Sequence, residues 1–226
     1  MGYFKFIIEA MKILVTGGCG YVGTLLVYEL LKNGHDVKVI DTQWFGNYLS
    51  KHKRLINIKK DFRNIIPSDL KGVDKIIHLA NIANDPGVEL NQTLSWEVNV
   101  LGLEKLLRIS KAEGVKQFIY ASSGSVYGIK KEKKVTEELS LLPISTYNKT
   151  KMIAERVITS YSDRNFKSHI IRPATVCGVS PRMRLDVSVN LLTHQAMKYK
   201  QITLFGGKQI RPNIHILDLV NVFIHF

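Results

Sequence analysis

The glycine-rich stretch VTGGCGYVG at 15–23 constrains the fold more than any other part of this chain. It follows an apolar run at 12–17 and opens a segment with helical spacing at 21–34. Its glycines recur at every third position, at Gly17, Gly20 and Gly23. Because they lack a Cβ, their backbone amides can approach a pyrophosphate, and the helix N-terminus adds partial positive charge. A strand, this loop and a helix in succession predict a dinucleotide-binding loop.

Short apolar runs alternate with longer amphipathic segments along most of the chain. We expect strands at 12–17, 35–41, 55–61, 73–80, 116–122 and 166–173, and helices at 21–34, 94–114 and 147–162. Apolar strands without alternation are typical of a parallel sheet covered on both faces. The pattern predicts an α/β fold with a Rossmann-type doubly wound sheet, whose crevice lies beyond the strand ends. Polar clusters follow these strands, which predicts one site at that edge: TGGCGYVG, DTQ, DFRN, HLAN and SSGS.

The pattern changes after residue 174. We expect an N-terminal extension at 1–10, an NAD-binding Rossmann domain at 11–174 and part of a smaller substrate-binding lobe at 175–226. Within that lobe, the spacing predicts a helix at 187–200 and a short strand at 201–206. The chain stops inside an apolar segment, so we expect the lobe to be C-terminally truncated.

Charge and composition narrow the possible partners. The formal net charge is +13, with lysines clustered at 51–54, 59–60 and 130–134. These clusters are not interleaved with aromatics and do not follow one helix, which favours solvated loops over a nucleic-acid surface. No apolar run reaches the roughly 18 residues of a membrane helix. Cys19 and Cys177 form no metal-ligand cluster. We therefore expect no nucleic acid, no membrane and no metal, and a cytoplasmic location.

Two carboxylates end predicted strands and bear on the choice of cofactor. Asp41 ends the second strand, where it can accept hydrogen bonds from adenosine ribose hydroxyls and would repel a 2′-phosphate. No arginine follows it in DTQWFGN. The sequence therefore predicts NAD rather than NADP. Asp61 ends the third strand and is placed to meet the adenine.

The segment TYNKTK places Tyr147 and Lys151 four residues apart at the start of a predicted helix. Residues i and i+4 share a helix face, so the ammonium would lie close to the phenol and to the cofactor ribose. Positive charge from the lysine and from oxidised nicotinamide favours the phenolate. A tyrosine that ordinarily titrates near pH 10 could then act as a general base near neutrality. A serine of SSGSVYG at 122–128 would hydrogen-bond the same substrate oxygen.

Taken in order, these motifs resemble the extended short-chain dehydrogenase/reductase superfamily, in its NAD-dependent epimerase/dehydratase branch, and are similar to UDP-glucose 4-epimerases. The resemblance spans residue 11 to the end of the chain. It is carried by TGGCGYVG, Asp41, DFRN, IIHLAN, WEVNVLG, YASSGSVYG, YNKTK, IIRPATVCG and RPNIHILD. It implies an enzyme: an isomerase is the preferred interpretation, and an oxidoreductase is the alternative.

The resemblance also implies roles for individual residues. Tyr147 would be the base, Lys151 its electrostatic partner and ribose ligand, and Ser123 the hydroxyl on the reacting oxygen. The residues implied to bind NAD are Gly17, Gly20, Tyr21, Val22, Gly23, Asp41, Asp61, Phe62, Leu79, Ala80, Asn81, Asn99, Tyr147 and Lys151. The residues implied to bind a nucleotide-sugar substrate are Ser123, Thr175, Asn190 and Arg211.

The implied reaction is nucleotide-sugar epimerisation through a transient keto-sugar, with hydride passing to NAD and back. The 4,6-dehydratases of this family carry Asp-Glu after the catalytic hydroxyl residue, whereas this chain has Gly124 and Ser125. Elimination of water would therefore lack its acid and base. Thr175 stands where similar 4-epimerases often have Asn, which leaves the sugar and the reaction open.

Alternatives to the epimerase are a nucleotide-sugar reductase or dehydrogenase of the same family and a non-catalytic NAD-binding fragment.

The resemblance also implies a homodimer. Its four-helix interface would be built from the predicted helices at 94–114 and 147–162.

Overall fold

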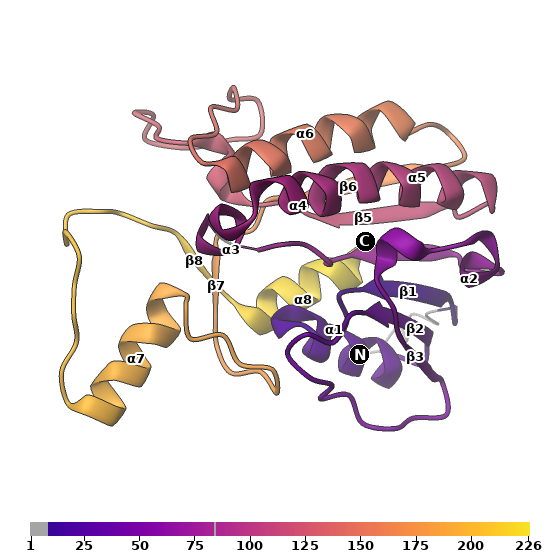
Figure 1. Ribbon diagram of the computed structural model, residues 1–226, viewed down its shortest axis with the longest axis horizontal. Helices are drawn as coiled ribbons and strands as arrows, with labels where there is room; N and C mark the ends of the chain where they lie inside the picture. Colours follow the sequence, from indigo (N-terminus) through magenta and orange to yellow (C-terminus); the bar gives the residue numbers. More distant parts are fainter. Residues whose placement is uncertain (1–8, 84) are drawn as a thin grey trace, which may run out of the picture.

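A computed structural model describes residues 9–83 and 85–226. Six parallel strands form one sheet in the order β3-β2-β1-β4-β5-β6 (Figure 1). They are β1 Lys12–Thr16, β2 Asp36–Asp41, β3 Leu55–Lys59, β4 Lys75–His78, β5 Gln117–Ala121 and β6 Lys167–Ile171. This strand order reverses beside β1, as in dinucleotide-binding Rossmann folds. The predicted doubly wound sheet and all six of its strands are confirmed.

Helices cover both faces of the sheet (Figure 1). On one face, α1 (Tyr21–Lys32) and α8 (Ile216–His225) pack over one apolar core. On the other, α5 (Leu103–Ala112) and α6 (Thr146–Tyr161) pack over a second core. The shorter helices are η1 Phe62–Asn64, α2 Pro67–Leu70, α3 Asp85–Leu90, α4 Gln92–Trp96 and η3 Gly124–Tyr127. The two covered faces explain why the strands are apolar without alternation.

The helix predicted at 94–114 is interrupted by a π-helical stretch. It runs through α4, then η2 (Glu97–Gly102), then α5. Such a wide turn re-aims the side chains within it and is frequent at functional sites. Here it carries Asn99, which is fully buried beneath the site.

The segment after residue 174 contributes elements of two kinds. Strands β7 (Thr175–Cys177) and β8 (Asn213–His215) form a small parallel sheet, and α7 (Ser188–Tyr199) follows the prediction. The strand expected at 201–206 is wrong, because these residues pair with no strand and are exposed. Helix α8 packs against α1 and the main sheet rather than against α7. Most of the extension expected at 1–10 lies outside the described residues.

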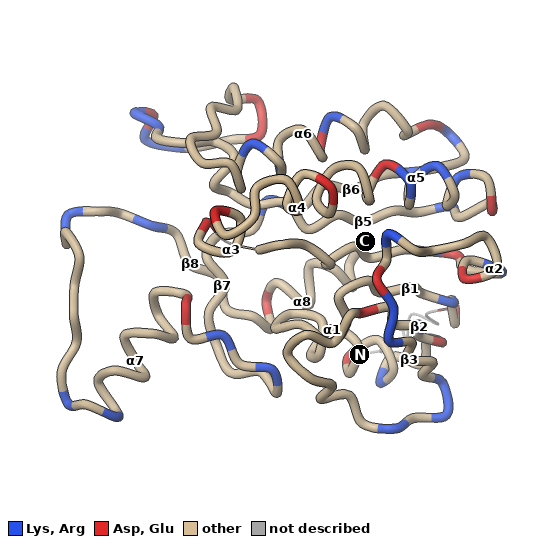
Figure 2. Tube along the Cα trace, in the orientation of Figure 1, with Lys and Arg blue, Asp and Glu red and all other residues tan. Residues whose placement is uncertain are grey.

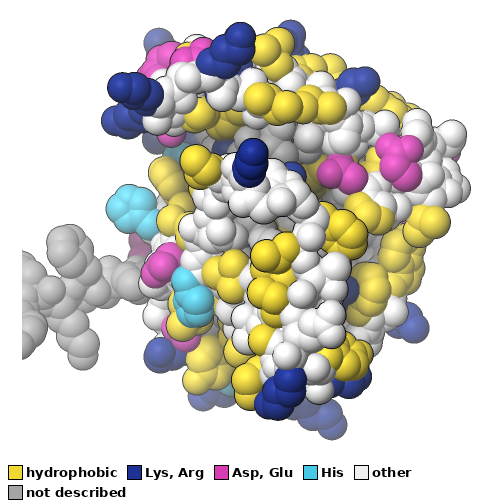
Figure 3. Space-filling model, turned by 90° about the vertical axis from the view of Figure 1, so that its left-hand side faces the viewer, with side chains coloured by type: hydrophobic (Ala, Val, Ile, Leu, Met, Phe, Trp, Pro, Cys, Tyr) yellow, Lys and Arg dark blue, Asp and Glu magenta, His cyan; other side chains and the backbone are white. Residues whose placement is uncertain are grey.

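Helix α7 and the chain after it extend away from the sheet (Figure 1). This side of the molecule faces the viewer in Figure 3, where hydrophobic side chains lie among polar and basic ones. The large apolar side chains exposed along this segment are Met197, Tyr199, Ile202, Leu204, Phe205 and Ile210. Only Asn190 of α7 is buried.

Positive charge is distributed over several loops rather than gathered on one element (Figure 2). The basic clusters at 51–54 and 130–134 lie on separate loops of the fold. This distribution agrees with the interpretation of the lysines as solvated surface. Across residues 9–83 and 85–226, no helix is both long and apolar enough to cross a membrane.

Candidate active site

The glycine loop joins β1 to α1 at the carboxyl edge of the sheet. Gly17 has φ +77°, and a Cβ on it would meet the backbone nitrogen of Ala80 at 2.6 Å. A Cβ on Gly23 would collide with the carbonyl oxygen of Gly17, and the Gly20 amide donates to that oxygen at 3.1 Å. Side chains are therefore excluded at Gly17 and Gly23, which leaves bare backbone at these positions beside the N-terminus of α1. That is the cradle a pyrophosphate requires.

Asp41 lies directly against this loop, as its spacing predicted. One carboxylate oxygen accepts from the Cys19 amide at 3.0 Å and the other from the Gln43 amide at 2.6 Å. The loop and the carboxylate expected to hold the adenosine ribose thus form one unit. Burial, followed by the charge of Asp41, raises the pKa of the Cys19 thiol to about 11, so this cysteine is an unreactive packing residue.

The segment after β4 supplies the next wall of the crevice. Leu79, Ala80 and Asn81 are partly buried beside the glycine loop. Asn99 braces this segment: its Oδ1 accepts from the Ile82 amide at 2.9 Å, and its Nδ2 donates to the Ile82 carbonyl at 3.2 Å. In the described part of the chain, both amide atoms of Asn81 are buried without a hydrogen-bond partner. Buried polar atoms are rarely left unpaired, so Asn81 is available to a ligand.

These features fit a dinucleotide. The side-chain-free cradle suits the pyrophosphate, and the Asp41 carboxylate beside it suits ribose hydroxyls. The unpaired Asn81 amide can both donate to and accept from a third polar group in the crevice. In the described residues, no group of three His, Cys, Asp or Glu side chains is placed to hold a metal ion.

Ser123, Tyr147 and Lys151 come together at the same edge. Ser145 caps α6 by accepting from the Asn148 amide, so the helix begins at Thr146 and places Tyr147 and Lys151 on one face. The Lys151 ammonium lies 5.8 Å from the Tyr147 ring centroid. The Ser123 hydroxyl, which follows β5, lies near enough to the Tyr147 phenol to lower its pKa. The predicted catalytic residues are therefore brought into one group.

The two titrating members of this group are shifted in opposite directions. Burial raises the pKa of Tyr147 to about 12, and Asp85 adds to this effect, while Arg184 and Ser123 oppose it. Burial lowers the pKa of Lys151 to about 7, against an opposing effect of Glu155. Desolvation is the largest effect on Tyr147 when no cofactor is bound, and Lys151 is not among the groups that lower its pKa. The predicted poising of the phenol near neutrality also includes the charge of oxidised nicotinamide, so it stays a prediction. Poising Tyr147 requires further positive charge in the crevice.

Arg184 is a site residue that the sequence did not single out. Its guanidinium forms a bidentate ion pair with Asp186, with Nε–Oδ1 at 3.0 Å and Nη2–Oδ2 at 2.5 Å. Its charge lowers the pKa of both Tyr147 and Tyr21, so it lies near both phenols. The only sequence signal was the basic loop SPRMRLD at 180–186, which gives no sign of where its side chains point.

Tyr21 and Asn190 bind each other, although the resemblance implied contacts with cofactor and substrate. The Tyr21 hydroxyl donates to the Gly178 carbonyl at 2.7 Å and accepts from Asn190 Nδ2 at 3.0 Å. Asn190 also donates to the Arg184 carbonyl at 2.9 Å and accepts from the Gly178 amide at 3.0 Å. Both side chains thus join the first turn of α1 to the loop before α7. Val22 lies beside them, partly buried.

Other predicted binding residues have partners within the protein or lie at the edge of the site. The Asp61 carboxylate is held by Arg63, with Nη2–Oδ2 at 2.7 Å. The Phe62 side chain is buried against His78, with ring centroids 4.9 Å apart. Thr175 is partly buried in β7. Arg211 lies in the exposed segment before β8.

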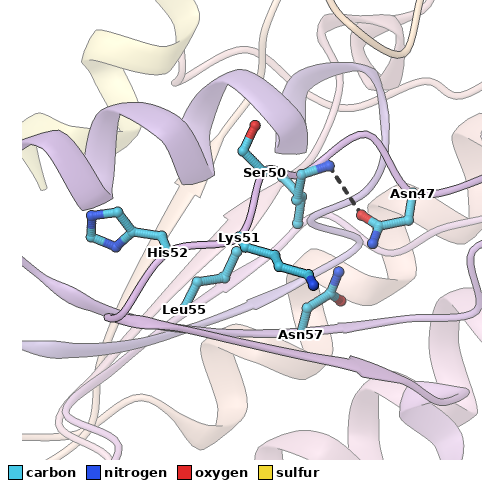
Figure 4. A pocket seen from close by; sticks show the side chains of 7 residues that line it. Asn47, Ser50, Lys51, His52, Leu55 and Asn57 are labelled. Carbon is cyan, nitrogen blue, oxygen red and sulfur yellow. Dashed lines mark hydrogen bonds between the residues drawn. The ribbon is translucent and has the colours of Figure 1, made fainter.

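A separate cavity of about 220 Å³ lies between the 47–52 segment and β3 (Figure 4). Its wall is fixed in part by the Leu49 amide, which donates to Asn47 at 3.0 Å. The side chains that line it are Asn47, Leu49, Ser50, Lys51, His52, Leu55 and Asn57. None of these is a predicted cofactor or substrate residue. Asn47 and Asn57 both contact the Cys19 thiol of the glycine loop, so the cavity adjoins the Asp41 end of the site.

The sheet order, the glycine loop with Asp41 and the Ser–Tyr–Lys group define an NAD-binding Rossmann protein with a short-chain dehydrogenase/reductase-type site. The model of the NAD-dependent epimerase/dehydratase family matches residues 13–226, and the chain belongs to that family.

Similar proteins include both epimerases and a dehydratase. The chain is 36% identical to a Bacillus subtilis (strain 168) protein described as an uncharacterized UDP-glucose epimerase, YtcB, over 93% of this chain and 70% of that protein. It is 30% identical, with a TM-score of 0.84, to UDP-glucuronic acid 4-epimerase from Bacillus cereus in complex with UDP-glucuronic acid and NAD, covering 95% and 72% of the two chains. It is 26% identical, with a TM-score of 0.86, to the NDP-hexosamine 5,6-dehydratase TunA, covering 95% and 71%.

Proposed function

We propose that this protein is an NAD-dependent nucleotide-sugar epimerase that acts through a transient keto-sugar. The observation that carries the proposal is the grouping of Ser123, Tyr147 and Lys151 at the cofactor crevice, with Gly124 and Ser125 following the catalytic serine. The similarity to proteins described as UDP-glucose and UDP-glucuronic acid epimerases supports it.

Each residue of the group has a defined task. Bound NAD supplies the hydride acceptor for sugar oxidation and the donor for its reversal. Tyr147 accepts the proton of a sugar hydroxyl and returns it at the end of the cycle. Lys151 holds positive charge beside the phenol and hydrogen-bonds the Ala121 carbonyl at 2.7 Å, which fixes its ammonium. Ser123 donates to the reacting oxygen from the opposite wall.

The turn after Ser123 disfavours a dehydratase. Elimination of water needs a general acid and a general base near the leaving group. A Cβ on Gly124 would lie 3.2 Å from the Pro173 carbonyl oxygen, so a side chain at this position requires the turn to shift. Ser125 binds the Ser123 hydroxyl at 2.8 Å and also donates to the Asn148 amide oxygen. Neither position offers a carboxylic acid.

We propose a homodimer built on the outer surface of α4, α5 and α6. Helices α5 and α6 lie side by side on one face of the sheet (Figure 1). Leu101, in the π-helical stretch before α5, is 63% exposed there. Its substitution by Glu should convert a dimer to a monomer in sedimentation, and a monomeric wild type would contradict this pairing.

The test is incubation of NAD-loaded protein with UDP-glucose, UDP-galactose and UDP-glucuronic acid in D₂O, followed by NMR and mass spectrometry. We expect inversion at one sugar carbon with the original hydrogen retained there, because hydride returns to the carbon that it left. Loss of one water would identify a dehydratase instead. Net formation of NADH would identify a dehydrogenase. Tight NAD binding with no sugar conversion would support a non-catalytic NAD-binding protein.

A further inference from the structure

Glu155 is a buried carboxylate that the proposed chemistry does not use. It lies one helical turn beyond Lys151 in α6 and is only 4% exposed. Arg172 binds it with Nε–Oε1 at 3.0 Å and Nη2–Oε2 at 2.7 Å. The Ser122 hydroxyl also donates to Glu155 Oε1. A buried carboxylate with three donors of this kind is held in one fixed position.

Each of these partners adjoins the catalytic group. Ser122 precedes the catalytic Ser123, and the carbonyl before it, that of Ala121, accepts from the Lys151 ammonium at 2.7 Å. On the opposite side, the residue after Arg172 is Pro173, whose carbonyl accepts from the Gly124 amide at 2.8 Å. The Glu155 network therefore connects α6, the end of β5 and the end of β6 around the catalytic serine turn.

Stability alone does not account for this network. Removing two charges from water costs several kcal/mol per ion, and a buried ion pair commonly gives no net stabilisation over an apolar pair. A residue pair of this type is better explained by what it fixes. Here it fixes the backbone that binds Lys151 and the turn that carries Ser123.

We propose that Glu155 is a positioning residue, which holds the catalytic serine turn through Ser122 and keeps the Lys151 ammonium charged. The positioning of Ser123 for catalysis rests on the proposed function. The effect of Glu155 on the charge of Lys151 does not depend on it.

The groups around Lys151 indicate that Glu155 keeps its ammonium charged. The other groups that face the ammonium are Tyr120 from β5, His78 from β4 and Tyr147 from α6 itself. Burial lowers the pKa of His78 to about 3, so that imidazole stays neutral, and burial raises the pKa of Tyr120, so that phenol stays protonated. Glu155 is the group whose charge raises the pKa of Lys151 against the effect of burial.

The test follows the titration of Lys151 by NMR in NAD-loaded protein carrying ¹³Cε-labelled lysine, with Lys151→Met used to assign the signal. We expect Glu155→Gln to lower the Lys151 midpoint by about one pH unit, because an adjacent opposite charge favours the charged form. An unchanged midpoint in Glu155→Gln would overturn the proposal.

Glu104 provides a matched control for this titration. Its carboxylate also binds a hydroxyl, that of Tyr161, and an arginine, Arg108, but on α5. Glu104→Gln should leave the Lys151 midpoint where it is. If Glu155→Gln does not fold, Glu155→Gln/Arg172→Gln removes both charges of the pair and takes its place. A smaller lowering is expected, because the opposing charge of Arg172 is lost as well, and a midpoint that does not fall would overturn the proposal.

Turnover separates the two parts of the argument. Ser122→Ala should lower kcat about tenfold with KM little changed, because it loosens the serine turn without removing any charge. If no nucleotide sugar is turned over by the wild type but the Lys151 midpoint falls in Glu155→Gln, the epimerase assignment fails and the electrostatic role stands. If turnover is present and kcat does not respond to Ser122→Ala, the positioning of the serine turn fails.

Discussion

The edge of the main sheet and the segment from 178 to 212 both border the site, but they are built differently. At the sheet edge, Asp41, Ser123, Tyr147 and Lys151 follow or face strands that are buried on both sides. In 178–212, α7 buries only Asn190, and residues 201–212 are all exposed. The difference teaches that the half of the site that holds the glycine loop is fixed by a core. The half proposed to bind substrate is fixed by a few hydrogen bonds to α1.

The largest effect is expected at Tyr147, the proposed base, which lies on the core-supported side of the site. Tyr147→Phe should reduce turnover about a thousandfold, because the proton acceptor is lost, while NAD affinity stays within about twofold. Parallel measurements of sugar conversion and NAD binding check both halves of the statement. Activity that survives this substitution would remove Tyr147 from the role of base.

Two leucines give a matched comparison of packing. Leu14 in β1 is fully buried, whereas Leu204 is 61% exposed. Leu14→Ala should lower the free energy of unfolding by about 3 kcal/mol, through lost burial and a cavity. Leu204→Ala should change it by less than about 0.5 kcal/mol. Chemical denaturation of both variants measures the difference, and equal losses would mean that 201–212 packs as tightly as the sheet.

We expect the buried Lys151 to lower the free energy of unfolding of the protein. Its folded pKa, about 7, lies below the ordinary 10.5, so between these values the folded state binds fewer protons than the unfolded state. Stability therefore rises with pH across this window. Lys151→Met should stabilise the protein by on the order of 2 kcal/mol below pH 7, and this gain should disappear above the ordinary lysine pKa. Denaturation midpoints across pH measure it; a gain independent of pH would contradict the shift.

Asp41 tests the cofactor half at the adenosine end. Asp41→Ala should weaken NAD binding about tenfold and narrow its advantage over NADP, because a carboxylate that repels the 2′-phosphate is removed. Titration calorimetry with both cofactors gives the ratio. An unchanged preference would show that the ribose lies elsewhere.

Most of the fold was predictable because its signals are local. Apolar runs, glycine positions and helical spacing predicted the six strands, α1, α6 and α7, and the i,i+4 rule placed Tyr147 near Lys151. The strand expected at 201–206 failed because apolar residues such as Leu204 form strands only where a partner strand is available.

Side-chain partners were harder to predict, because they depend on residues far apart in sequence. Tyr21 meets Asn190 across the crevice, and Glu155 meets Arg172 behind it. The binding of Asp61 to Arg63, two residues on, was not anticipated either, and its contact with the adenine stays a prediction. The shift of Tyr147 was also missed, since desolvation follows from packing and not from spacing.

The central claim is that a positively charged cofactor beside Tyr147 converts this partly buried phenol, whose pKa is about 12, into a base. The direct test is the tyrosinate absorbance of wild type minus that of Tyr147→Phe at about pH 8, with and without NAD. With NAD bound, we predict that the difference between wild type and variant equals the tyrosinate absorbance of one residue. Without NAD, we predict no difference. No signal in either state would contradict the account.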